Sequence, residues 1–246
     1  MTTPYVSQTQ YGKFEEFNLQ VARGQITGHS TLNIYGYQPA VSTTSIPVWE
    51  NATAYTYPVA ASTMYLSGTN GDTAQILVLG LDLAYKPISE TVTLNGATPV
   101  ATVKQYLRIN SMSVTVGSAT NPAGIVYLKN QAGTVTYAQI NTNIGRTQMA
   151  IYTVPAGYTF YLQRVAIYTS LNGNDYVTYQ NKTTTASGVV QVTQQAPFAS
   201  NYDALRIMPR PILEKTDIQL LCAIKTGTGA VAVAQEGYLI KNETGY

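Results

Sequence analysis

Residues 73–96 read TAQILVLGLDLAYKPISETVTLNG, and this stretch decides the fold class. Two runs of residues that favour strands, 73–83 and 88–94, flank the turn Ala84–Pro87, and Asn95-Gly96 follows the second run. Asn-Gly is a strong hairpin signal because both residues tolerate positive φ. Short apolar runs separated by turn residues are typical of antiparallel sheets. This region is therefore predicted to be a β-hairpin.

The same pattern continues along the chain. A second series starts at Arg146, and residues 158–169 (YTFYLQRVAIYT) alternate between two faces before the turn at Asn172-Gly173. We count about a dozen strands and no convincing helix, which predicts an all-β fold with a jelly-roll-like β-sandwich. That is more than one jelly roll needs, so we predict two sandwich domains, 46–144 and 145–246. A single large sandwich extended by the early strands is the alternative.

The first 45 residues differ from the rest, because they carry scattered aromatic residues and glycines without a sustained period of two. We interpret 1–45 as an extended arm that becomes ordered against a partner, so its removal is expected to leave a folded domain. The alternative is that the arm adds an edge strand to its own sandwich. The predicted partner-interface residues are Tyr5, Tyr11, Phe14, Phe17 and Tyr35.

Charged residues form only 11% of the chain, against roughly 25% in average soluble domains, while 20 tyrosines are present. Protein contact surfaces are rich in Tyr and poor in Lys and Glu, so much of this surface is expected to meet other protein. Alternatively, exposed strand faces simply carry Thr and Tyr. The net charge of +2 is spread thinly, which argues against a nucleic-acid partner.

Targeting and cysteine signals are sparse. The chain starts MTTPYVSQTQYGKFEEF, without a secretory leader, and has no window near the roughly 20 apolar residues of a membrane span. We therefore expect synthesis in the cytoplasm and no membrane partner. Cys222, the single cysteine, lies in an apolar run and is predicted to be a small core residue.

The sequence offers little for catalysis, and we predict no catalytic, cofactor-binding or metal-binding residues and no enzymatic activity. His29 is the only histidine and has no Gly-x-Ser-x-Gly serine as a partner. The aspartates lie beside turns or strand ends, where Asp caps its own backbone. A pair of glutamates facing each other across a groove, as in glycosidases, stays an alternative. These glutamates are Glu15, Glu16, Glu50, Glu90, Glu214, Glu236 and Glu243.

Tyrosines and the lone Trp49 could also form a sugar-binding face, although Tyr in strands more often packs across the sheet.

Several ordered segments between residues 17 and 240 resemble a family of virion structural proteins from tailed phages, especially phages of marine bacteria and cyanobacteria. The segments are Phe17–Ser30, Gly80–Asp82, Ser89–Gly96, Tyr106–Asn110, Met149–Gly157 and Glu214–Ile218.

The resemblance implies a non-catalytic virion component with a jelly-roll-like sandwich. It implies a head decoration or cement protein that binds the major capsid protein or other virion proteins as a homo-oligomer, with a trimer as the expected form. The alternative is an adsorption protein of the tail or neck that binds a host surface glycan. Neither role supplies a catalytic residue.

Overall fold

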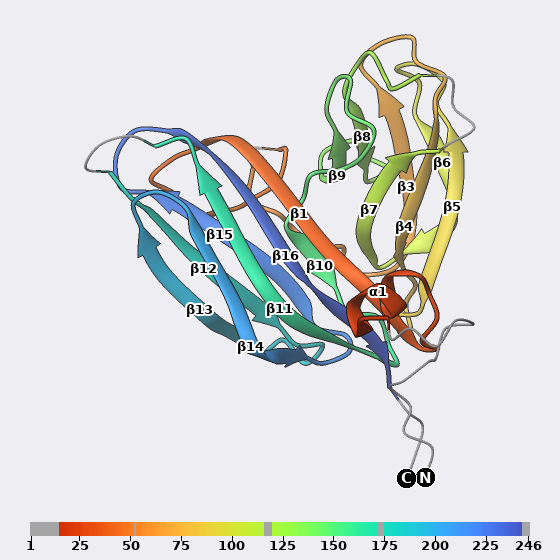
Figure 1. The fold of residues 1–246 in the computed structure, drawn as a ribbon. Helices are drawn as coiled ribbons and strands as arrows, with labels where there is room; N and C mark the ends of the chain where they lie inside the picture. The colour runs from red at the N-terminus through yellow and green to blue at the C-terminus, as the bar shows by residue number, and fades with distance from the viewer. Residues whose placement is uncertain (1–14, 52, 116–119, 172–174, 243–246) are drawn as a thin grey trace.

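The computed structural model describes residues 15–51, 53–115, 120–171 and 175–242. Sixteen strands and one six-residue helix, α1 (Phe17–Ala22), make up its regular structure (Figure 1). The predicted all-β fold is confirmed. None of the helical structure in the described ranges has the length and apolar character that a membrane span requires.

Eight of the strands form a jelly roll. One sheet has the order β1-β16-β11-β14 and the other the order β10-β15-β12-β13, with β2 also paired to β15. Numbered one to eight in chain order, from β1 through β10–β16, the strands lie 1-8-3-6 and 2-7-4-5, which is a double Greek key. The bounds are β1 His29–Val41, β2 Ile46–Pro47, β10 Ile151–Thr153, β11 Tyr158–Thr169, β12 Val177–Thr184, β13 Val190–Phe198, β14 Tyr202–Ile212, β15 Asp217–Ile224 and β16 Gly229–Lys241.

The remaining seven strands form a second, smaller sandwich with its own core. Its sheets have the orders β6-β3-β8-β9 and β5-β4-β7. Met64, Ile76 and Leu128 are among its buried core residues, whereas Phe160, Ile167 and Leu220 belong to the core of the jelly roll. The bounds are β3 Ser62–Gly68, β4 Gln75–Leu81, β5 Pro87–Thr93, β6 Val100–Tyr106, β7 Arg108–Val114, β8 Val126–Lys129 and β9 Thr136–Ile140.

The small sandwich is an insertion in the jelly roll, because the chain leaves after β2 and returns at β10 (Figure 1). All strands of the small sandwich lie inside the predicted range 46–144. The range 145–246, in contrast, does not contain the whole jelly roll, since β1 and β2 come from the N-terminal part of the chain.

Strand β1 corrects the prediction of an irregular arm over 1–45. It pairs with β16 from His29 opposite Ile240 to Gln38 opposite Val231, as the edge-strand alternative supposed. The period of two was hidden because the buried side of β1 carries Gly36 and Gln38 next to Ile34. Gly36 is required there, since a Cβ would lie 2.4 Å from the Val48 carbonyl oxygen. The Gln38 amide donates to the Trp49 carbonyl at 2.8 Å.

Candidate functional site

The residues with catalytic potential have structural contacts in the fold. The His29 Nδ1 atom lies 3.1 Å from the Thr27 carbonyl, and the His29 ring contacts Phe17. Among the described residues, no three His, Cys, Asp or Glu side chains gather as metal ligands would. Cys222 is buried, and burial raises the pKa of its thiol well above the usual range.

The contacts of the glutamates in the described ranges do not include a facing pair. Glu90 accepts hydrogen bonds from the backbone N–H groups of Val103 and Lys104 at 2.7 and 2.8 Å, and Glu236 pairs with Arg164. Glu15 pairs with Arg23, and Glu214 accepts from the Gly157 N–H at 2.5 Å. Glu16 precedes α1 as its N-cap residue, and Glu243 lies outside the described residues. These acids therefore serve local structure.

Glu50 is the exception. It lies where the chain crosses from the jelly roll to the small sandwich and is only 7% exposed. Both carboxylate oxygens are buried without a hydrogen bond from the described residues. Burial raises the pKa of Glu50 from 4.5 to about 7, and the nearby backbone N–H groups of Gln148 and Asn141 offset only part of that rise. Within the described ranges no second carboxylate contributes to this pKa shift, so the arrangement does not resemble a glycosidase pair.

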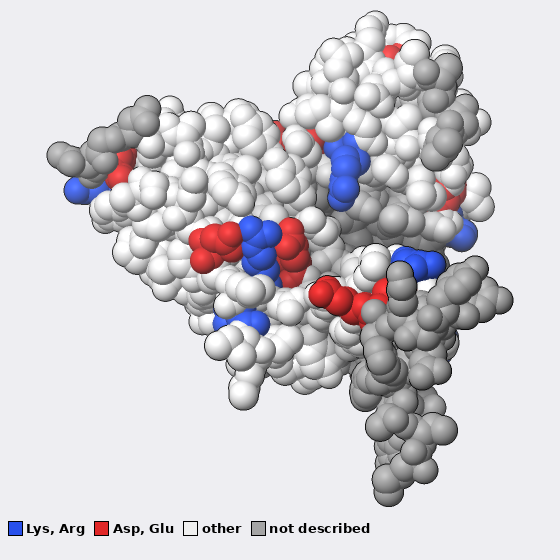
Figure 2. All heavy atoms as spheres, viewed as in Figure 1, with Lys and Arg blue, Asp and Glu red and all other residues white. Residues whose placement is uncertain are grey.

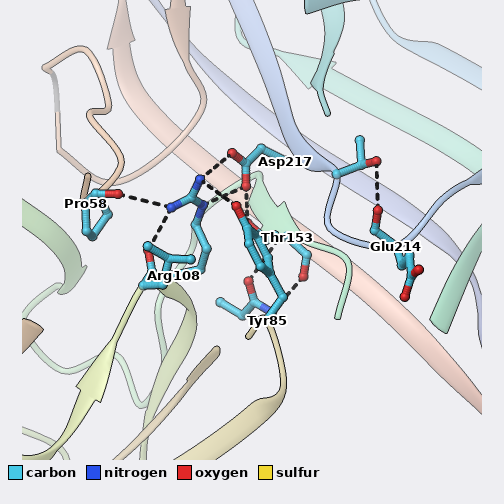
Figure 3. A network of polar contacts seen from close by, with 9 residues as sticks. Pro58, Tyr85, Arg108, Thr153, Glu214 and Asp217 are labelled. Atoms are coloured by element: carbon cyan, nitrogen blue, oxygen red, sulfur yellow. Dashed lines mark hydrogen bonds and ion pairs between the residues drawn. The ribbon is translucent and has the colours of Figure 1, made fainter. Parts of the chain in front are cut away.

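A buried ion pair joins the two sandwiches (Figure 3). Arg108 of β7 donates to Asp217 of β15 through Nε at 2.8 Å and Nη2 at 3.0 Å. Their side chains are only 12% and 8% exposed. The Thr153 hydroxyl donates to the same carboxylate at 2.6 Å, and the Asn110 amide exchanges two hydrogen bonds with the Thr153 backbone. We call Arg108, Asp217, Thr153 and Asn110 the clamp.

The clamp is well satisfied electrostatically. Burial lowers the pKa of Arg108, but the hydrogen bonds and charge of Asp217 outweigh this, and the pKa stays above its usual value. The guanidinium lies 4.7 Å from the Tyr57 ring centroid and donates to the Pro58 carbonyl at 3.1 Å. A closed, fully partnered pair at a junction between domains has a structural role, since it leaves no open position for a ligand.

The opposite side of the jelly roll is uncovered. Strands β13 and β14 are the outer strands of the two sheets, and they lie side by side on the side away from the small sandwich (Figure 1). We call β13, β14 and the residues beside them, 189–213, the open edge. Half of the exposed large hydrophobic side chains of the described residues lie within it. They are Val189, Val190, Val192, Leu205, Ile207, Met208 and Leu213.

A bulge in β14 pushes part of the open edge outward. Leu162 of β11 pairs with Arg210 and Arg164 pairs with Leu205, so four residues, 206–209, lie opposite Gln163 alone. The ladder is locally broken at such a bulge and the strand bends. Ile207 and Met208, at the bulge, are 99% and 85% exposed.

Asp203 of the open edge pairs with Arg164 of β11, and the two arginines of the edge bind groups of the edge itself. Arg206 donates to the Gln194 side-chain oxygen, and Arg210 donates to the Thr193 carbonyl at 2.7 Å. Burial lowers the pKa of Arg210, and the charge of Arg206 lowers it further. The outward surface of the edge is therefore mainly aliphatic. On the face in Figure 2, one row of alternating acidic and basic side chains crosses the jelly roll, and most of the remaining surface is uncharged.

The two predicted interface residues that the structure describes, Phe17 and Tyr35, lie elsewhere. Phe17 packs against Tyr238 with ring centroids 5.5 Å apart, and Tyr35 is a half-buried residue of β1 opposite Ala234. Tyr5, Tyr11 and Phe14 lie outside the described residues. The structure does not bring Phe17 or Tyr35 to the open edge.

Sequence reasoning missed the open edge, although a signal was present. Pro197, Pro209 and Pro211 all fall inside strands, and proline in a strand marks an edge because it cannot donate to a ladder.

Trp49 is not available to stack on a sugar. Trp49 is 1% exposed, packs edge-on against Tyr55 at 5.2 Å and donates to the Thr53 carbonyl at 2.9 Å. A recess of about 550 Å³ beside the open edge carries hydroxyl side chains such as Thr183, Thr193 and Thr216, and no aromatic ring lines it.

Comparison with known proteins gives little further guidance. No family model and no curated protein matches the chain. A structure of the Gt strain of infectious bursal disease virus is 11% identical, covering 89% of this chain and 78% of that chain, with a TM-score of 0.19. The VP2 subviral particle of infectious bursal disease virus is 10% identical with the same coverage and a TM-score of 0.14. Scores this low do not indicate a shared fold.

Proposed function

We propose that this protein is a non-enzymatic virion structural protein that decorates and cements a viral head by binding the major capsid protein or other virion proteins. The open edge is the observation that carries the proposal. Monomeric soluble proteins rarely expose long aliphatic edge strands, because such edges pair with other chains. A partner protein therefore belongs to the working state of this molecule.

Two further observations support a place in the virion. Jelly rolls recur in capsid proteins and lectins, which is an argument by analogy at the level of the fold. The segments quoted above resemble virion proteins of tailed phages. A cement protein that binds only the assembled shell stabilises the shell by mass action, and this needs a contact surface but no reactive group.

A tail or neck adsorption protein that binds a host glycan is the second candidate. The hydroxyl-lined recess beside the open edge favours it, because Thr183, Thr193 and Thr216 can bond sugar hydroxyls. It lacks the aromatic platform on which sugars commonly stack, so we place it behind the cement role.

Copy number separates the two candidates. Virions made from the genome that encodes this protein would be purified, and the protein quantified against the major capsid protein by gel densitometry and mass spectrometry. Hundreds of copies per particle are expected for a cement protein, and a few to a few dozen for an adsorption protein. Absence from washed virions would overturn both, and sustained glycan degradation by the purified protein would overturn the non-enzymatic assignment.

A further inference from the structure

We infer that the recess beside the open edge binds an acidic sugar, with Arg210 contacting the acid group and Arg206 supplying a second positive charge. A sugar site adds to the cement role, and it gives the second candidate, the adsorption protein, the class of ligand on which that candidate depends. The positions of the two arginines, their lack of an acidic partner and the hydroxyl groups of the recess each support it.

The two arginines reach across the open side of the jelly roll from one sheet to the other. Arg210 of β14 lies opposite Leu162, which is fully buried, so both side chains lie on the inner face of their sheet. Arg210 Nη1 donates to the Thr193 carbonyl of β13 at 2.7 Å, and Arg206 donates to the Gln194 side-chain oxygen of β13. The guanidinium groups therefore lie between the sheets, where β13 and β14 end them.

The positive charges of this pair are not neutralised. Among the described residues, neither arginine forms an ion pair with a carboxylate, and the acceptors from Thr193 and Gln194 are neutral. The two charges lie close enough to interact, since Arg206 lowers the pKa of Arg210 in addition to the effect of burial.

Donors beside the arginines also lack acceptors in the described part of the chain. Arg206 Nε is buried without a hydrogen bond, and so is the amide nitrogen of Asn181, which lies opposite Gln194. Guanidinium groups bind carboxylate and phosphate through paired, charge-assisted hydrogen bonds. Two neighbouring arginines with unused donors and no anion therefore favour a ligand that carries an oxyanion.

The recess supplies room and hydroxyl groups for the rest of the ligand. Arg210 lines this recess of about 550 Å³ together with Glu214 and Lys215, whose opposite charges offset each other. Glu214 also accepts from the Gly157 N–H, so the charge of Arg210 is left for a ligand. Five hydroxyl side chains complete the polar lining: Thr183, Thr185, Ser187, Thr193 and Thr216. Hydroxyls can donate and accept, which suits a ligand with several hydroxyls and one acid group, as an acidic sugar has.

NMR titration of the full chain tests the class of ligand with four probes: methyl glucuronide, glucose 6-phosphate, methyl glucoside and inorganic phosphate. At least one acidic sugar should bind tenfold or more tightly than the glucoside and inorganic phosphate, with shifts at the amides of Thr183, Thr193 and Arg210, and the sugar that binds identifies the oxyanion. Equal binding of acidic and neutral sugars, equal binding of inorganic phosphate, or shifts away from the recess would overturn the inference. An aspartate-containing peptide that binds more tightly than either sugar would make a protein carboxylate the ligand and overturn it as well.

Variants test the role of Arg210. Arg210→Gln should weaken binding of the acidic sugar at least tenfold, because a hydrogen bond between charged groups is lost. Arg164→Gln is the matched control, since it removes one positive charge from the neighbouring strand β11, where Arg164 pairs with Asp203 and Glu236. Wild-type affinity in Arg210→Gln, or an equal loss in Arg164→Gln, would overturn the inference.

Arg210 also links the two sheets, so circular dichroism must show that the variant folds. If Arg210→Gln does not fold, Arg210→Lys decides, because it keeps the charge but loses the paired hydrogen bonds of a guanidinium. It should bind the acidic sugar several-fold more weakly, and wild-type affinity would overturn the inference.

Copy number keeps this test separate from that of the proposed function. A protein present in hundreds of copies per virion that binds none of the sugars would overturn the inference and leave the cement role intact. A protein that binds an acidic sugar in the recess but is absent from washed virions would support the inference and overturn the proposed function.

Discussion

The two sides of the jelly roll differ in what covers them. On one side, β10 lies next to the inserted sandwich, and the polar groups of the clamp bond to one another across the junction. On the other side, β13 and β14 are uncovered and carry aliphatic side chains. An edge that the chain covers itself can hold an ion pair such as Arg108–Asp217, because the two partners stay together in the folded chain. An aliphatic edge without an internal cover is suited to a partner that arrives later.

Removing a strand from the covered side should have the largest effect on folding. Deleting residues 1–41 removes β1, with its ladder to β16 and the buried Ile34 and Val41. We expect the jelly roll not to fold, because the apolar face of its sheet and one edge of β16 would be exposed together. Deleting 1–14 removes no described strand and should leave the melting temperature nearly unchanged. Circular dichroism melts of both truncations decide this, and a folded 1–41 deletion would restore the arm interpretation.

Breaking the clamp should cause the next largest loss of stability. Asp217→Ala leaves the Arg108 guanidinium buried without its anion, and breaking a buried pair costs about 3–5 kcal/mol of unfolding free energy. Asp203→Ala removes a partner of the exposed Arg164, and exposed pairs contribute little, so its unfolding curve should overlay that of the wild type. Urea denaturation measures both. Equal losses in the two variants would mean that the junction does not depend on the clamp.

Glu50, on the covered side, should make the stability of the protein depend on pH. The folded pKa of Glu50 is raised from 4.5 to about 7, so the folded state holds the proton more tightly than the unfolded state. The resulting stabilisation is complete below about pH 4.5 and is lost as the pH rises through 7. At 1.36 kcal/mol per pKa unit this amounts to roughly 3 kcal/mol.

The matching variant is Glu50→Gln, which keeps the shape of the side chain and removes its charge. Urea denaturation at pH 5, 6, 7 and 8 should show a falling stability for the wild type and a flatter profile for the variant. Parallel profiles would show that another group is responsible for the pH dependence.

Local patterns in the sequence predicted much of the fold. The hairpin expected at 73–96 is β4 and β5, and the alternating run 158–169 is β11 with the same bounds. These elements are visible because their side-chain period is two and their turns use residues with defined backbone preferences. Strand β1 was missed because Gly36 and Gln38 satisfy a close approach and a buried carbonyl, neither of which requires an apolar residue.

The functional surfaces were harder to predict, because they depend on which strands become neighbours. Asp217 was interpreted as a residue that caps its own backbone, as Asp82 does toward Ala84 and Lys86. It instead pairs with Arg108, 109 positions away in the chain. Likewise, Val190 and Val192 fit an ordinary strand pattern, and only their pairing with Thr184 and Lys182 shows that they lie on the outer face of the sheet.

Substitutions at the open edge should have the smallest effect on stability. A buried residue of β14 provides the control. Ile207→Ser replaces a side chain that is 99% exposed, whereas Ile212→Ser, five residues later, replaces one that is 5% exposed and packs in the jelly-roll core. Exposed positions without packing change the unfolding free energy by less than about 0.5 kcal/mol, while truncating a buried isoleucine costs about 2–5 kcal/mol. Urea denaturation measures the unfolding free energy of both variants. A cost at Ile207 close to that at Ile212 would mean that the bulge packs within its own chain, and the open edge would then not be a surface reserved for a partner.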